Sequence, residues 1–216
     1  MERYFLFDDK NTFYDWNLIL TSKTITPPEP KTNNIEIDGM SGSLDLSEAL
    51  IGEITYFDRS ISMSFWTDYG SRTDRNELLR KIRTNLHGRK IKIIEPDDPE
   101  HYFFGRVKIT NETNIIPYAE ISIDATCEPW RYSLCESERI INVNGSSDIV
   151  INNHGVKTLC PDIHVDGNIS IRQNDLNISL TDGLYKISDL KFYSGSNVLN
   201  ITGRGVVKFV YREADL

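Results

Sequence analysis

The chain has 216 residues, 39% hydrophobic and 26% charged, which is typical of a globular protein with one large core or two smaller ones. Its 24 Lys and Arg face 32 Asp and Glu, and the net charge of −8 disfavours a nucleic-acid binder, because phosphate contacts need clustered cations. Charge from Glu2 onward argues against a signal peptide, and no run approaches the roughly 18 apolar residues of a membrane span, so we expect synthesis in the cytoplasm and no membrane contact.

The first part of the chain predicts β-strands joined by a tight turn. Ile35–Asp38 and Leu44–Ser47 alternate between apolar and polar residues. Gly39 and Gly42 lie between them, and glycine readily adopts the positive φ angles that tight turns need. Ser60–Trp66 also alternates with period two, which is typical of a half-buried strand.

One segment has helical periodicity instead. Between Asp74 and Leu86 the apolar residues form one stripe, made of Leu78, Leu79, Ile82 and Leu86. Asp74 and Glu77 have the spacing of a capping box at the start of the helix. Gly88 has the position of a left-handed residue that ends it.

The helical segment also concentrates positive charge. Between residues 72 and 92 only Asp74 and Glu77 oppose eight basic residues. We consider five of these as candidate contacts to another subunit or partner: Arg72, Arg75, Arg80, Lys81 and Arg83. The alternative is that they form the solvated face of an amphipathic helix. If the group does bind a partner, a neighbouring copy of this acidic chain balances the charge better than DNA does.

Three more strands follow the helix. Lys90–Ile94 and His101–Ile109 flank the acidic, proline-containing segment Glu95–Glu100, which we interpret as a turn. Its carboxylates offer an alternative as a calcium site, but the Asp-x-Asp-x-Asp-Gly spacing is absent. The next strand is Tyr118–Cys127, and its alternation predicts that Cys127 is buried as a small hydrophobic residue.

A domain boundary is predicted near residue 133. Pro129 and Trp130 follow the strand that ends at Cys127, and proline cannot donate a hydrogen bond to a β-ladder. The polar stretch Ser133–Glu138 comes next. We therefore expect one domain over residues 1–133 and a second over residues 134–216.

The second domain predicts short alternating strands, such as Leu176–Leu180 and Val206–Tyr211. Turn signals lie between them at Asp166-Gly167, Asp182-Gly183 and Gly203-Arg204-Gly205. Strands at intervals of about 8–12 residues indicate a β-sandwich. The fold class is therefore mainly β, with an N-terminal β-sandwich-like domain that contains one α-helix and a C-terminal β-sandwich.

No pattern predicts catalysis, a cofactor or a metal. The three cysteines are not at metal-ligand spacing, and the histidines have no second ligand nearby in sequence: His87, His101, His154 and His164. A disulfide between Cys135 and Cys160 is an alternative, but free thiols are favoured in the cytoplasm. A hydrolase that uses unrecognised carboxylates is the least favoured hypothesis.

The segment Ile37–Ser47, followed by Tyr56–Ile61, resembles the N-terminal signature of siphophage distal tail proteins. The order of helix, hairpin and a strand that closes on Cys127–Tyr132 is similar to the same family, and so is Asn200–Arg212 to its last strands. The resemblance spans nearly the whole chain. Its motif positions are structural rather than catalytic, and we single out Gly39, Gly42, Asp45, Pro129 and Trp130.

The resemblance implies a virion structural protein of the tail tip or baseplate, made in the host cytoplasm. It implies a hexameric ring formed by residues 1–133 and a galectin-like β-sandwich over residues 134–216. The ring would connect the tail tube protein to tail-tip and receptor-binding proteins, and DNA would pass through its channel only as cargo. Related hubs occur in contractile and bacteriocin-type particles, which the sequence does not separate from siphophage tails.

A carbohydrate-binding module is the alternative function, acting through residues 134–216. Sugar sites usually offer an aromatic platform with polar groups around it. All three tryptophans precede this domain, at positions 16, 66 and 130. Tyr185 and Tyr193 are the candidate platforms, although core packing explains such residues more simply.

Overall fold

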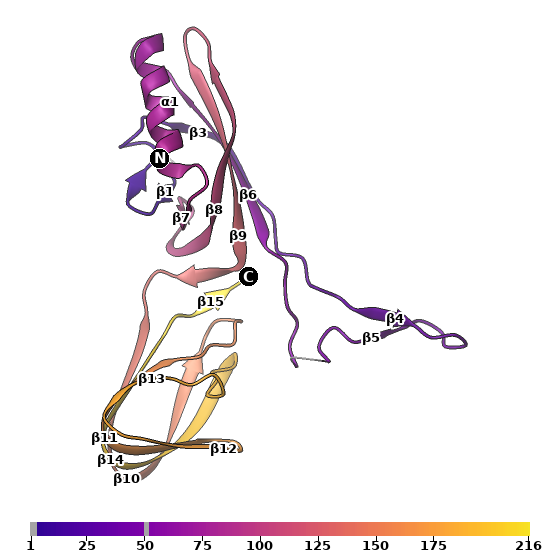
Figure 1. The fold of residues 1–216 in the computed structure, drawn as a ribbon, viewed down its shortest axis with the longest axis vertical. Helices are drawn as coiled ribbons and strands as arrows, with labels where there is room; N and C mark the ends of the chain where they lie inside the picture. The colour runs from indigo at the N-terminus through magenta and orange to yellow at the C-terminus, as the bar shows by residue number, and fades with distance from the viewer. Residues whose placement is uncertain (1–3, 50–51) are drawn as a thin grey trace. The chain divides into compact units, whose positions relative to one another are not determined.

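The computed structural model describes residues 4–49 and 52–216 (Figure 1). The chain divides into two compact units, one that ends at Arg131 and also includes Leu216, and one over Tyr132–Asp215. Each unit has its own hydrophobic core, and β-strands dominate both. Among the described residues, no helix has the length and apolarity that crossing a membrane requires.

The first unit is built on one sheet with the strand order β2-β1-β7-β8-β9-β6-β3. The predicted strands at residues 60–66, 90–94, 101–109 and 118–127 all lie in this sheet, as parts of β6, β7, β8 and β9. The bounds are β1 (Leu6–Phe7), β2 (Lys10–Asn11), β3 (Ile19–Ile25), β6 (Arg59–Thr67), β7 (Lys90–Glu95), β8 (Asp98–Asn114) and β9 (Ala119–Ser133).

The strand predicted to end at Cys127 runs on instead. β9 continues through Pro129 as far as Ser133. The neighbouring strand β6 pairs with β9 only up to Cys127, which lies opposite Arg59. Pro129 therefore lies beyond the part of β9 that β6 pairs with, so the N–H that proline lacks is not needed by this neighbour.

The helix α1 (Arg72–Leu86) packs its apolar stripe into the core of the first unit. All four predicted stripe residues are buried, in one cluster with residues such as Trp16, Phe65 and Ile123. Cys127 belongs to the same core, which confirms its predicted burial, and burial raises the pKa of its thiol to about 12. All three cysteines are free, as favoured from the sequence.

The predicted capping box is shifted by three residues. Ser71, not Asp74, is the N-cap, and its hydroxyl accepts a hydrogen bond from the Asp74 N–H at 3.3 Å. Asp74 in turn accepts from the Ser71 N–H at 2.7 Å, and this bond lowers the pKa of the Asp74 carboxyl. The helix starts at Arg72 because a serine hydroxyl was available one turn earlier. At the other end Gly88 has φ +80°, as predicted.

A two-stranded hairpin forms an arm of the first unit. Its strands are β4 (Asn34–Glu36) and β5 (Ser43–Asp45), and both Gly39 and Gly42 have φ +85° in the turn that the sequence predicted. Every residue from 29 to 45 is exposed, and we call this segment the arm. Backbone bonds close its base, where the Lys31 N–H donates to the Thr55 carbonyl at 2.7 Å.

The second unit has a curled five-stranded sheet with the order β10-β14-β11-β12, in which β13 also pairs with β11 (Figure 1). Long strands bend around a core that contains Ile163, Phe192 and Phe209, as the walls of a β-sandwich do. A short strand, β15 (Ala214–Asp215), also belongs to this unit. The other bounds are β10 (Ser137–Asn153), β11 (Asp162–Gln173), β12 (Leu176–Leu180), β13 (Gly183–Lys186) and β14 (Gly195–Tyr211).

Two turns predicted in this unit are wrong. Gly203-Arg204-Gly205 lies inside β14, and Asp166-Gly167 lies inside β11. Gly167 and Gly205 are register partners, and both have positive φ. A Cβ on Gly205 would lie 2.0 Å from the Asp166 carbonyl oxygen, and one on Gly203 would lie 2.1 Å from that of Asn168. These glycines allow adjacent strands to approach closely where the sheet bends, which the sequence signal does not distinguish from a hairpin turn.

The glycines provide a test of this bend. Gly145 on β10 also has positive φ, +103°, but a Cβ there meets no atom within 4 Å. We expect Gly145→Ala to cost about 1 kcal/mol of stability from backbone strain alone. Gly205→Ala adds a clash with the backbone, so hydrogen exchange measured by mass spectrometry should show loss of protection across β10, β11 and β14. Equal protection in the two variants would contradict the close approach.

Candidate assembly surfaces

The predicted basic residues of α1 do not form one surface. Arg75 is buried, at 4% exposure, and its guanidinium donates to the Asn114 side-chain oxygen at 3.1 Å and to the Gly70 carbonyl at 2.9 Å. Asn114 also donates to the Arg72 carbonyl at 3.0 Å. Arg75 therefore ties the start of the helix to the end of β8.

Other cations of this region are paired on the surface. The Arg83 guanidinium binds the Glu112 carboxylate through two nitrogens, and these hydrogen bonds raise the pKa of Arg83. Lys90 pairs with Glu128 at 2.7 Å and lies over the Phe104 ring at 4.6 Å. These contacts leave less positive charge for a partner than the sequence suggested.

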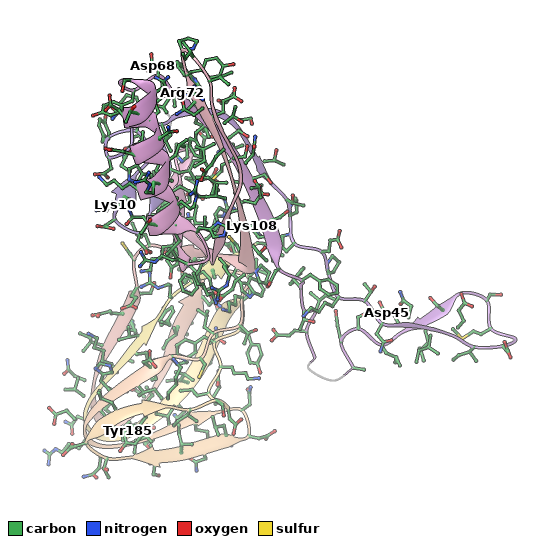
Figure 2. All side chains as sticks on the ribbon, turned by 45° about the horizontal axis from the view of Figure 1, so that its top comes forward. Lys10, Asp45, Asp68, Arg72, Lys108 and Tyr185 are labelled. Atoms are coloured by element: carbon green, nitrogen blue, oxygen red, sulfur yellow. The ribbon has the colours of Figure 1, made fainter. Side chains whose placement is uncertain are left out.

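Three predicted contact residues are exposed and have no ion pair within the described part of the chain: Arg72, Arg80 and Lys81. Figure 2 shows Arg72 at the N-terminal end of α1. Together they form the charged part of the helix that a neighbouring molecule can reach. For these three residues the solvated-face interpretation and the contact interpretation both stay open.

The acidic segment considered as a calcium site is bound by protein cations. Only its central residues, Pro96 and Asp97, form the turn, because β8 starts at Asp98. The ammonium of Lys23 lies between the carboxylates of Glu95 and Asp97, 2.7 Å from the latter. Across residues 4–49 and 52–216 no group of three or more His, Cys, Asp or Glu has the geometry to hold a metal ion.

The arm exposes apolar side chains although it is folded. Ile35 and Leu44 are register partners, and with Ile37 and Met40 they are exposed. Asp45 lies on the same hairpin (Figure 2), where its carboxylate accepts hydrogen bonds from Ser47 that lower its pKa. An isolated two-stranded hairpin is at best marginally stable in water, so this one has an apolar surface without a core of its own.

The remaining motif residues lie at the end of the first unit. Trp130 packs edge-on against Tyr56 with ring centroids 5.6 Å apart. Pro129 precedes it on β9, in the stretch that extends past β6. Both residues therefore lie near the end of β9, where the chain leaves the first sheet.

The second unit has an open groove of about 490 Å³ on the outer face of its sheet. His164 and Leu184 are register partners in its lining, and Lys186 pairs with Asp162 at 2.9 Å. Tyr185 (Figure 2), a candidate sugar platform, also lines the groove, but its ring packs against the core and its hydroxyl donates to the Thr181 carbonyl at 3.1 Å. Tyr193, the other candidate, is exposed and lies outside this groove.

No protein-family model and no curated protein matches the chain. The combination of two β units in one chain is nevertheless the fold of a phage tail hub protein. The solved structure that shows this is the Dit protein (gp 19.1) of SPP1, described as a paradigm of the hub adsorption apparatus in phages that infect Gram-positive bacteria. The two structures align with a TM-score of 0.75 over 99% of each chain, at 14% sequence identity. This likeness confirms the fold that the distal tail resemblance implied.

The assignment of Arg75 as a buried anchor and of Arg80 as an exposed residue can be tested with matched substitutions on α1. Arg75→Ala removes a buried side chain and two hydrogen bonds to Asn114 and Gly70, so we expect a loss of about 1–3 kcal/mol in unfolding free energy. Arg80→Ala, an exposed arginine on the same helix, should change it by about 0.5 kcal/mol or less. Denaturant unfolding followed by tryptophan fluorescence measures both, and similar losses for the two variants would contradict the assignment.

Proposed function

We propose that this chain is a structural component of a phage tail tip, where six copies form a ring that connects the tail tube protein to tail-tip and receptor-binding proteins. The observation that carries the proposal is the fold likeness to the SPP1 hub protein, because it covers 99% of both chains and not one common domain. The role requires no catalysis and no cofactor, and we propose that the chain has neither. It would be made in the host cytoplasm, and DNA would pass the ring only as cargo.

The arm supports assembly between copies. Its apolar residues Ile35, Ile37 and Met40 are fixed on a hairpin that offers them no core, and a second protein surface would remove them from water. Burial of apolar surface is worth roughly 25 cal/mol per Å², so these three side chains together with Leu44 contribute several kcal/mol to an interface. A closed ring uses one patch against a different patch on the next copy, which an arm reaching a neighbour satisfies.

The edges of the first sheet offer further contacts. β3 and β2 are the outer strands of the seven-strand order, so each has one side free of a neighbour within that order. Unpaired backbone N–H and C=O groups on an edge can bond to a strand of another molecule. We infer that such pairing could extend the contact that the arm begins.

The arm provides the sharpest test of ring formation. We expect the wild-type chain to reach six times its single-chain mass in light scattering, alone or with the tail tube protein, and to form rings in negative-stain images. Ile35→Asp with Leu44→Asp should keep the chain monomeric, because a charge in an apolar interface is costly to desolvate. Thermal unfolding should be unchanged, since both side chains are already exposed.

A matched control places the same charges elsewhere. Val150→Asp with Val198→Asp changes exposed apolar residues that are register partners on β10 and β14, and should assemble like the wild type. A wild-type chain that stays monomeric even with the tail tube protein would sink the ring proposal.

Sugar binding by the second unit is the second candidate, and the groove is the observation that favours it. Its volume lies within the range of small-molecule sites. A glycan array with the full chain tests it: we expect any hit to be lost in a His164→Ala, Lys186→Ala double variant, both residues being exposed in the groove. Tyr193→Ala, outside the groove, is the control. No hit at all on the array would remove this candidate.

A further inference from the structure

Arg59 is a buried cation that has no ion pair within the described part of the chain. It is the first residue of β6 and points to the same side as Ile61, Met63 and Phe65, so its side chain enters the core. Only 5% of the residue is exposed, and its Nε and Nη2 atoms are buried without any hydrogen-bond acceptor. Leaving a charged donor buried and unpaired costs several kcal/mol, which native proteins rarely tolerate without a reason.

A second arginine lies on the neighbouring strand. Arg59 is opposite Cys127 on β9, and Arg131 follows on the same face of that strand, four residues later. The Nε atom of Arg131 is also buried without an acceptor, although its Nη1 donates to the Asp98 carboxylate at 2.9 Å. Burial first, and then the charge of Arg131, lower the pKa of the Arg59 guanidinium.

The acidic groups around this pair do not balance it. The Asp98 carboxylate is shared, because its other oxygen lies 2.7 Å from the His101 ring nitrogen. Asp58 is exposed, and Glu128 pairs with Lys90. The Cys127 thiol is neutral at ordinary pH, since its pKa is about 12. Among the described residues, the Asp98 carboxylate and the Leu216 oxygen, 3.4 Å from Arg131 Nη2, both bind Arg131, and neither is hydrogen-bonded to Arg59.

We propose that Arg59 and Arg131 form a binding site for a small oxyanion, of the class of phosphate, sulfate or a simple carboxylate. A guanidinium presents its N–H groups in a fixed planar fork that matches the oxygens of such an anion. Three nitrogen atoms of the pair lack an acceptor, and an anion with several oxygens can accept from more than one of them at a time. The Phe103 ring, 5.1 Å from the Arg59 guanidinium carbon, holds that group in place before binding.

The site is independent of ring formation, because it is built from β6, β8 and β9 of one chain. Sequence analysis did not single out Arg59 or Arg131. The period-two pattern of β6 does carry the signal: continuing it back from Phe65 through Met63 and Ile61 reaches Arg59. An arginine at a core position of an alternating strand indicates a buried cation that needs an anion.

The experiment uses the full chain, desalted into a buffer without oxyanions. Isothermal titration with phosphate, sulfate and acetate, each against chloride at equal ionic strength, measures binding directly. We expect saturable binding of at least one of the three, weakened about ten-fold or more in Arg59→Met and in Arg131→Met, because charged hydrogen bonds are lost. Comparison of the three anions identifies whether tetrahedral or carboxylate oxyanions fit.

Two further measurements distinguish anion binding by Arg59 from a purely structural role of this residue. Without oxyanion, Arg59→Met should be at least as stable as the wild type, because methionine removes an unpaired buried charge. With oxyanion, the wild type should gain melting temperature and Arg59→Met should keep only the general effect of the salt. Arg80→Met, an exposed arginine on α1, should respond as the wild type does. No saturable binding of any anion, or equal binding in Arg59→Met, would overturn the site.

Discussion

The first unit depends on one apolar layer, which the helix α1 shares with the sheet. Ile82 and Leu86 reach the layer from the helix, while Phe65 and Ile123 reach it from β6 and β9. A 15-residue helix of this polarity is marginal by itself in water, so packing on the sheet, and not propensity, keeps it folded. The sheet in turn fixes where β3 and β6 end. The arm lies in the segment between those two strands, and the Lys31 N–H closes its base by donating to the Thr55 carbonyl at 2.7 Å.

This arrangement explains why charge in the sequence is a poor guide to charge on the surface. A cluster of eight cations spreads over the helix α1, the connecting residue Arg89 and the strand β7, and the positions meet different environments. Arg75 is used inside to anchor the helix, Arg83 is paired with Glu112, and Arg80 is left exposed. The local pairs are formed with acids distant in sequence, which no reading of the segment alone could supply. The same holds for Lys23, which meets Glu95 across 72 positions of the chain.

The sequence predicted the features that local rules determine. The apolar stripe of α1, the Gly39 and Gly42 turn and the burial of Cys127 follow from periodicity and from the conformational freedom of glycine. It could not predict that β9 passes Pro129, because that depends on where β6 stops pairing. Nor could it place Gly203 and Gly205 inside β14, since close approach of strands and a tight turn require the same residue. The sequence identified the basic residues of the helix, but only the fold shows that Arg75 is buried whereas Arg72, Arg80 and Lys81 are exposed.

The arm and the arginine pair are both incomplete in the isolated chain, but they lack different things. The arm lacks an apolar surface, whereas Arg59 lacks an acceptor for its buried N–H groups. An anion held by Arg59 acts at fixed stoichiometry on one chain, whereas an arm seated on another molecule depends on protein concentration. Under the proposed function a chain can hold both, since the anion would complete the core of each copy and the arm would join the copies.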